Sequence, residues 1–124
     1  MNAKELNFKE LTIWQKAIDF AEMVITAVED NTSDRKHYRL LEQAESAATS
    51  VSSNIAEGKG RYSKKEFIQF LYIARGSLYE TISIMTIFYQ KGWINKEVLD
   101  NVESEGLALA KMINALIKSI KEKI

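Results

Sequence analysis

The residues best placed to do chemistry lie in the stretch SSNIAEGKGRYSKKEF, residues 52–67, where Gly58 and Gly60 flank Lys59. Glycines beside a lysine are typical of loops that hold phosphate groups. A Walker loop, however, has the order G-x-x-x-x-G-K-[ST], follows a strand and opens a helix. Here the order is Gly-Lys-Gly, the stretch follows a helical pattern, and no strand is predicted. The spacing therefore favours a corner between two helices over a nucleotide site.

Other reactive arrangements find little support in the sequence. His37 is the only histidine and there is no cysteine. Metal sites in helix bundles use Glu-x-x-His pairs that project into the core, but the apolar stripes described below carry no carboxylate. No G-x-S-x-G motif is present. Acid–base pairs among the seventeen acidic residues stay open, because nothing selects one of them. We therefore predict no catalytic residue, cofactor or metal, and a protein that is not an enzyme.

Composition favours one globular domain. The chain has 124 residues, of which 46% are hydrophobic and 27% charged, and this balance argues against disorder. The N-terminus has no signal-peptide pattern, and no run approaches the roughly 18 apolar residues of a membrane span. We therefore expect a cytoplasmic protein with no membrane contact. Seventeen basic and seventeen acidic residues give a net charge of zero, so only a local patch could attract nucleic acid.

Four apolar stripes with helical spacing organise the chain, and there is no proline to interrupt them. They lie at residues 14–28, 40–55, 67–89 and 99–120. Short turns between long helices predict an all-α, antiparallel up-down-up-down four-helix bundle over residues 11–124. Residues 1–10 are expected to form an N-terminal tail.

Helix-capping and helix-ending residues predict where these helices begin and end. Thr12 with Gln15 fits a capping box, as does Ser63 with Glu66, and Asn95 fits a cap for the last helix. Gly58 is expected to end the second helix in a left-handed conformation. Gly60 is expected to give the backbone of the turn conformational freedom.

Two further roles are predicted around this corner. Tyr62 is expected to form a hydrophobic staple with Phe67, with a stacking platform for bases as the alternative. Asn54 and Glu57 are expected to supply hydrogen bonds that fix the corner.

The third stripe is wider than a single bundle face requires. Its core face is predicted to hold Phe67, Leu71, Ala74, Leu78, Ile82, Met85 and Tyr89. Large apolar residues also lie outside that face, and a coherent second face favours self-association. We therefore predict a subunit interface formed by Tyr72, Ile73, Tyr79, Ile84 and Ile87, with Ile68 also outside the core face.

Charge is expected to collect at one end of the bundle, where the second turn meets both chain termini. This end holds Lys4, Lys9, Lys59, Arg61, Lys64, Lys65, Lys118, Lys121 and Lys123, against Glu5, Glu10, Glu57, Glu66 and Glu122. Nine basic against five acidic residues leave plus four here and minus four elsewhere. We predict that Lys59, Arg61, Lys64 and Lys65 contact phosphates. Copies packed in the same direction would form a basic ring that binds a polyanion by avidity.

Three longer segments carry a resemblance to a known family: LTIWQKAIDFAEMV, YRLLEQAESAATSVSSNIAEGKGR and SKKEFIQFLYIARGSLYE. The chain resembles, from about Leu11 to Ile120, the four-helix-bundle proteins encoded by intervening sequences of bacterial 23S ribosomal RNA genes. This family is related to the accessory variability-determinant proteins of diversity-generating retroelements. The resemblance implies a homopentamer without established enzymatic activity. Its retroelement relatives bind nucleic acid and associate with a reverse transcriptase.

One departure from the family pattern bears on function. Family members often carry an arginine pair after the glutamine of the second helix, whereas here Gln43 is followed by Ala44, Glu45 and Ser46. The leading hypothesis is a non-enzymatic oligomeric bundle that contacts RNA, DNA or a ribonucleoprotein, with a reverse transcriptase as a possible partner. The alternatives are a protein-binding scaffold without nucleic-acid binding and an enzyme with an unrecognised site.

Overall fold

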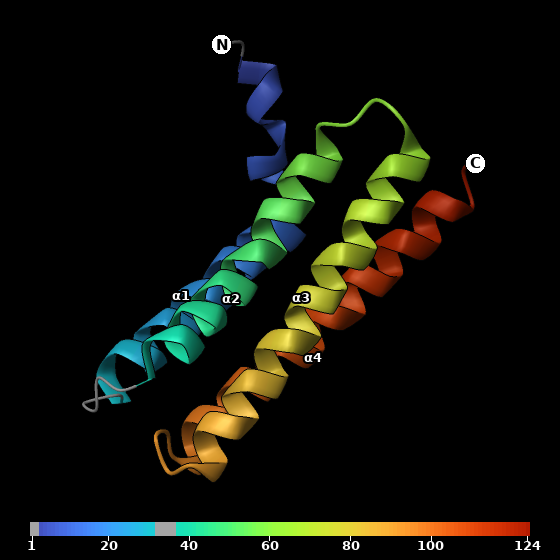
Figure 1. The fold of residues 1–124 in the computed structure, drawn as a ribbon. Helices are drawn as coiled ribbons and strands as arrows, with labels where there is room; N and C mark the ends of the chain where they lie inside the picture. Colours follow the sequence, from blue (N-terminus) through green and yellow to red (C-terminus); the bar gives the residue numbers. More distant parts are fainter. Residues whose placement is uncertain (1–2, 32–36) are drawn as a thin grey trace.

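A computed structural model describes residues 3–31 and 37–124. These residues form a short 3-10 helix, η1 (Ala3–Glu10), and four α-helices: α1 (Thr12–Asn31), α2 (Tyr38–Lys59), α3 (Lys64–Gln90) and α4 (Lys96–Lys121) (Figure 1). The described residues contain no β-strand, so the expected all-α class with four helices is confirmed. The segment expected as a tail is helical from Ala3 and contacts α1 and α2.

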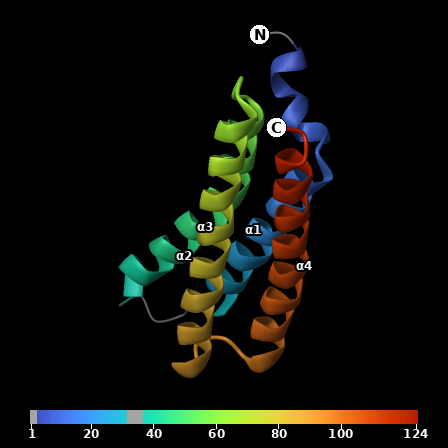
Figure 2. The same cartoon turned by 90° about the vertical axis from the view of Figure 1, so that its right-hand side faces the viewer.

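The four helices enclose a shared core. Helix α1 packs against α2 and α4, and α3 packs against the same two helices, an arrangement consistent with a four-helix bundle. The α2–α3 connection lies at the same end of the molecule as η1 and the C-terminus, while the α3–α4 connection lies at the opposite end (Figures 1 and 2). The residues predicted to collect positive charge are therefore brought to one end.

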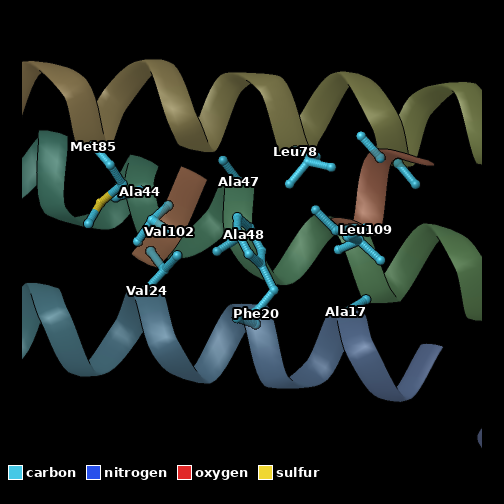
Figure 3. Packing of buried hydrophobic residues seen from close by; sticks show 14 of the residues in the cluster. Ala17, Phe20, Val24, Ala44, Ala47, Ala48, Leu78, Met85, Val102 and Leu109 are labelled. Atoms are coloured by element: carbon cyan, nitrogen blue, oxygen red, sulfur yellow. The ribbon is translucent and has the colours of Figure 1, made fainter. Parts of the chain in front are cut away.

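Small side chains on α2 let its neighbours approach closely. Ala44 and Ala48 are completely buried, and Ala47 is nearly so. Figure 3 shows them beside larger core residues from the other helices, among them Phe20 of α1 and Leu78 of α3. Each large side chain buried in this way stabilises the fold by about 1.5–3 kcal/mol relative to exposure. Ala44, Ala47 and Ala48 thus form the closely packed face of α2.

Helix α3 buries a wider arc than predicted. Ile68 and Ile84 were expected outside the core face, yet they are only 5% and 4% exposed and belong to the core. Tyr89 was expected inside and is 38% exposed, while Phe88 is completely buried. The physical reason is that α3 contacts both α2 and α4, so both edges of its core-facing stripe are covered. Ile84 is therefore removed from the predicted subunit interface.

Gly58 does not end α2 in a left-handed conformation. The helix continues through Gly58 to Lys59, and Gly60 follows with φ −78°. Among the described residues, a positive φ occurs at Gly92, where α3 ends. Gly58 is instead buried against α3: a Cβ added there would lie 2.7 Å from the Phe70 Cβ and 2.9 Å from the Phe67 Cδ1. Its role is to allow close approach of two helices.

Two of the predicted helix caps form, and two other local predictions are wrong. The Ser63 Oγ accepts a hydrogen bond from the Glu66 amide at 3.4 Å, and the Asn95 Oδ1 accepts one from the Val98 amide at 2.9 Å. Helix α1 already includes Thr12, and the Gln15 side chain donates to the Lys9 carbonyl instead of closing a box. The Tyr62 side chain is fully exposed, so it makes no staple with Phe67.

Removing either cap is expected to destabilise the protein. Ser63→Ala should lower the free energy of unfolding by about 1 kcal/mol, because one amide at the start of α3 loses its acceptor. Asn95→Ala should cost at least as much, since its hydrogen bond is shorter. Urea unfolding followed by circular dichroism, at one fixed protein concentration, measures both changes. An unchanged midpoint in both variants would contradict the capping assignment.

Candidate nucleic-acid interface

The basic residues predicted to contact phosphate surround the α2–α3 connection. Lys59 is the last residue of α2 and is half-buried, while Lys64 and Lys65 are exposed in the first turn of α3. The amino end of a helix carries a partial positive charge, so two lysines there are unfavourable for the helix itself. By contrast, Lys118 and Lys121 lie in the last turn of α4, where cations stabilise the helix. Stabilisation of a helix end therefore explains the lysines of α4 but not Lys64 and Lys65 of α3.

Arg61 differs from the other predicted contact residues because its charge is already engaged. Its Nη2 donates to the Glu57 Oε1 at 3.0 Å, and its guanidinium lies 4.8 Å from the centroid of the Phe70 ring. Within residues 3–31 and 37–124, Lys59, Lys64 and Lys65 form no ion pair. These three lysines are the available cations of the predicted set. Lys4 and Glu5, also assigned to this end, have side chains outside the described part.

Glu57 and Asn54 were both expected to fix the corner by hydrogen bonds, and their hydrogen bonds lie in different parts of α2. Glu57 pairs with Arg61 at the connection. The Asn54 amide nitrogen donates to the Ser50 carbonyl at 2.8 Å and lies 2.9 Å from the Ser50 Oγ. That hydroxyl is 2.9 Å from the Ser77 Oγ of α3. Asn54 therefore supports a polar contact between α2 and α3 that lies about two and a half turns before the end of α2.

A groove that the sequence did not reveal lies beside the connection. We call it the end groove, and its volume is about 320 Å³. It is lined by Leu11, Lys59, Arg61, Tyr62, Ser63, Lys64, Phe67, Leu116, Ile120 and Lys123. Its apolar residues come from the start of α1, from α3 and from the end of α4, and the bundle alone brings them together. The sequence signal that pointed to this place was Tyr62 beside Arg61, for which a stacking platform was the alternative to a staple.

Beside this end, cationic side chains gather around Tyr72. The Lys121 Nζ donates to the Tyr72 hydroxyl at 2.7 Å, and the Arg75 guanidinium lies 5.0 Å from the ring centroid. The Arg75 Nη1 in turn donates to the Asn114 Oδ1 at 2.8 Å. Tyr72 was predicted to contact another subunit through an apolar face. It is half-buried and engaged with α4 of its own chain.

The outer face of α3 carries the remaining residues of the predicted interface. Ile73, Tyr79 and Ile87 are 52%, 51% and 43% exposed. A strip of exposed residues with alternating spacings of three and four runs along this face. It consists of Gln69, Ile73, Gly76, Glu80, Ser83, Ile87 and Gln90, and we call it the α3 seam. This spacing allows two helices to pack along their length, here around Ile73 and Ile87 with small or polar residues between them.

Other candidate chemistry finds no support in the described residues. The His37 ring lies against the Trp93 ring with centroids 3.9 Å apart, next to the start of α2 and beyond the end of α3. These two helix ends lie opposite the α2–α3 connection (Figure 1). Across residues 3–31 and 37–124, no group of histidine, aspartate and glutamate side chains could hold a metal ion. None of the described helices combines the length and the hydropathy that a membrane span requires.

Comparisons with known proteins place the chain in a family. A solved structure similar to it is the 1.70 Å crystal structure of a protein of unknown function from the S23 ribosomal protein family of Bacteroides thetaiotaomicron. The two share 21% identity and a TM-score of 0.80, over 86% of this chain and 99% of that one, which shows a common fold. No functionally curated protein matches the chain. The family model for the 23S rRNA-intervening sequence protein matches residues 9–115, and the chain therefore belongs to this family.

Proposed function

We propose that the protein is a non-enzymatic, antiparallel four-helix-bundle subunit that contacts RNA, DNA or a ribonucleoprotein through its basic end. The observation that carries this proposal is the group of exposed or half-buried lysines around the α2–α3 connection, which form no described ion pair. Cations without carboxylate partners interact with phosphate at little cost in lost contacts. Such contacts are independent of base sequence and position the nucleic acid.

Self-assembly would strengthen a weak single contact. The proposal includes a homo-oligomer, a pentamer by resemblance to the family, formed through the α3 seam. If the subunits point in one direction, their basic ends form a ring, and a polyanion that touches several subunits gains affinity by avidity. A partner such as a cytoplasmic ribonucleoprotein or a reverse transcriptase would supply this polyanion in the form of its bound nucleic acid.

A protein-binding scaffold is the second candidate. The observation that favours it is the exposed apolar surface on α3 and α4, which includes Tyr79 and Leu107 at 51% and 57% exposure. These two residues line a groove of about 350 Å³ between the helices. A net charge of zero is also compatible with a partner that is not a polyanion. Absence of nucleic-acid binding at low salt would put this candidate first.

The test of nucleic-acid binding is a salt titration with a charge-reversed variant. Fluorescence anisotropy with labelled RNA and DNA should show affinity that falls steeply with salt and varies little with sequence. Lys59→Glu with Lys64→Glu should weaken binding at least tenfold. It should also make the slope of log K against log salt shallower by about 1.5 for each subunit that touches the strand, because each lost phosphate contact removes roughly 0.7–0.9. Arg61 stays unchanged, since a glutamate there would repel Glu57.

The matched control places the same charge change at the opposite end of the molecule. Arg39→Glu with Lys91→Glu alters two exposed residues, in the first turn of α2 and just after α3, that form no described ion pair, and it should leave affinity and salt slope unchanged. Equal losses in the two double variants would mean that total charge, and not the basic end, governs binding. No detectable binding of the unmodified protein at low salt would refute the proposal.

A further inference from the structure

Tyr62 is held in an unusual position for an aromatic residue. Its side chain is fully exposed, at 105% of the reference area, in the turn between α2 and α3. It belongs to the rim of the end groove, whose apolar part includes Phe67, Leu116 and Ile120. An exposed aromatic ring beside an open apolar groove offers a flat surface that water covers poorly.

The charges around this groove indicate the kind of group that fits it. Lys59, Lys64 and Lys123 lie on its lining, together with Arg61, whereas no side-chain carboxylate of the described residues lines it. A ligand of matching chemistry has one flat apolar group flanked by negative charges. In a nucleic-acid strand each base is flanked by phosphates on both sides, so one nucleotide step supplies both features. The volume of about 320 Å³ is at the lower end of the range for small-ligand sites, roughly 300–1,000 Å³.

We infer that the end groove receives an unpaired base of a single-stranded nucleic acid, which stacks on Tyr62 while its neighbouring phosphates contact the rim lysines. This inference rests on the proposed function and narrows its ligand. In a duplex the bases are paired and stacked on one another, so a duplex offers phosphates to the lysines but no base to the groove. The protein should therefore bind single strands more tightly than duplexes of the same sequence.

Removing the Tyr62 ring tests this preference. The probe is an oligouridine of roughly 15 nucleotides, near the site size of known single-strand binders, with one 2-aminopurine at its centre. Tyr62→Ala should weaken single-strand binding by about fivefold to a hundredfold, as expected for loss of one stacked base. It should also abolish the quenching of 2-aminopurine fluorescence on binding. Duplex affinity and the salt slope should stay unchanged, because the lysines are intact.

Two control variants separate stacking from other effects. Tyr62→Phe keeps the aromatic ring and should retain both affinity and quenching. Tyr38→Ala removes a tyrosine that is 60% exposed, and it should change neither quantity. Tyr38 is the first residue of α2, and this helix starts at the other end of the bundle (Figure 1). Since Tyr62 is fully exposed and makes no staple, its removal is not expected to impair folding.

The outcomes distinguish this inference from the proposed function. If the protein binds with a steep salt slope but Tyr62→Ala behaves like the unmodified protein, base stacking is refuted and phosphate contact stands. If neither strand form binds, the proposed function fails with it. Binding of an acidic peptide that contains one phenylalanine, lost in Tyr62→Ala and without binding of the oligouridine, would assign the end groove to a protein partner and overturn the inference.

Discussion

Replacing Gly58 with valine is expected to lower the free energy of unfolding by about 3 kcal/mol, the upper end of the usual cost of overpacking. A Cβ at this position would lie 2.7 Å from the Phe70 Cβ, which is fixed to the backbone of α3 and cannot rotate away. The two methyl groups of valine add further volume at a point where α2 and α3 lie close together. Relief requires the two helices to separate.

Gly106 provides the matched comparison within the same bundle. A Cβ there would lie 2.8 Å from the Ile82 Cδ1, the far end of a flexible side chain that can move. Alanine is favoured over glycine inside a helix by about 1 kcal/mol, so Gly106→Ala should be close to neutral. Gly58→Ala should be destabilising despite the same gain. Urea unfolding measures all three variants, and an unchanged midpoint for Gly58→Val would refute the close-approach role.

Placing charges on the α3 seam is expected to dissociate the oligomer. The unmodified protein should have a mass several-fold that of one chain by light scattering at micromolar concentration. Ile73→Glu with Ile87→Glu should reduce it to the mass of one chain, because two carboxylates would be desolvated without partners in each contact. Both side chains are about half exposed within the subunit, so helix content by circular dichroism should be retained.

The mass measurement needs a control variant outside the α3 seam, and two results would contradict the prediction. Ile124→Glu alters an apolar residue of similar exposure outside the seam and should leave the mass unchanged. A monomeric unmodified protein would exclude self-assembly. An unchanged mass in the double variant would exclude the α3 seam and direct attention to the groove beside Tyr79 and Leu107.

The family and the helices could be predicted from the sequence. Apolar spacing located four helices, and the family resemblance is confirmed by the match over residues 9–115. The caps at Ser63 and Asn95 were also predictable, because a capping hydrogen bond joins residues three positions apart. The close packing of α2 also has a local origin, because the small side chains of Ala44, Ala47 and Ala48 let a neighbouring helix approach.

Other assignments depended on residues distant in the chain. Gly58 follows an apolar stripe as a helix-ending glycine would, and only its contact with Phe70 of α3 shows that it permits close approach. The spacing of apolar residues placed Ile84 outside the core face of α3. It is buried because α3 is flanked by two helices that cover both edges of its stripe. Arg61 looked free until the structure showed its contacts with Glu57 and Phe70.

The end groove depended on tertiary structure most of all. Leu11, Phe67 and Ile120 are separated by more than fifty positions, and they line one groove because the start of α1, the start of α3 and the end of α4 meet at the same end. The sequence by itself determined the helices, two of their caps and the family, because periodicity and capping act over a few residues. Burial, charge pairing and the shape of the surface were decided only by packing, because each depends on which parts of other helices come into contact.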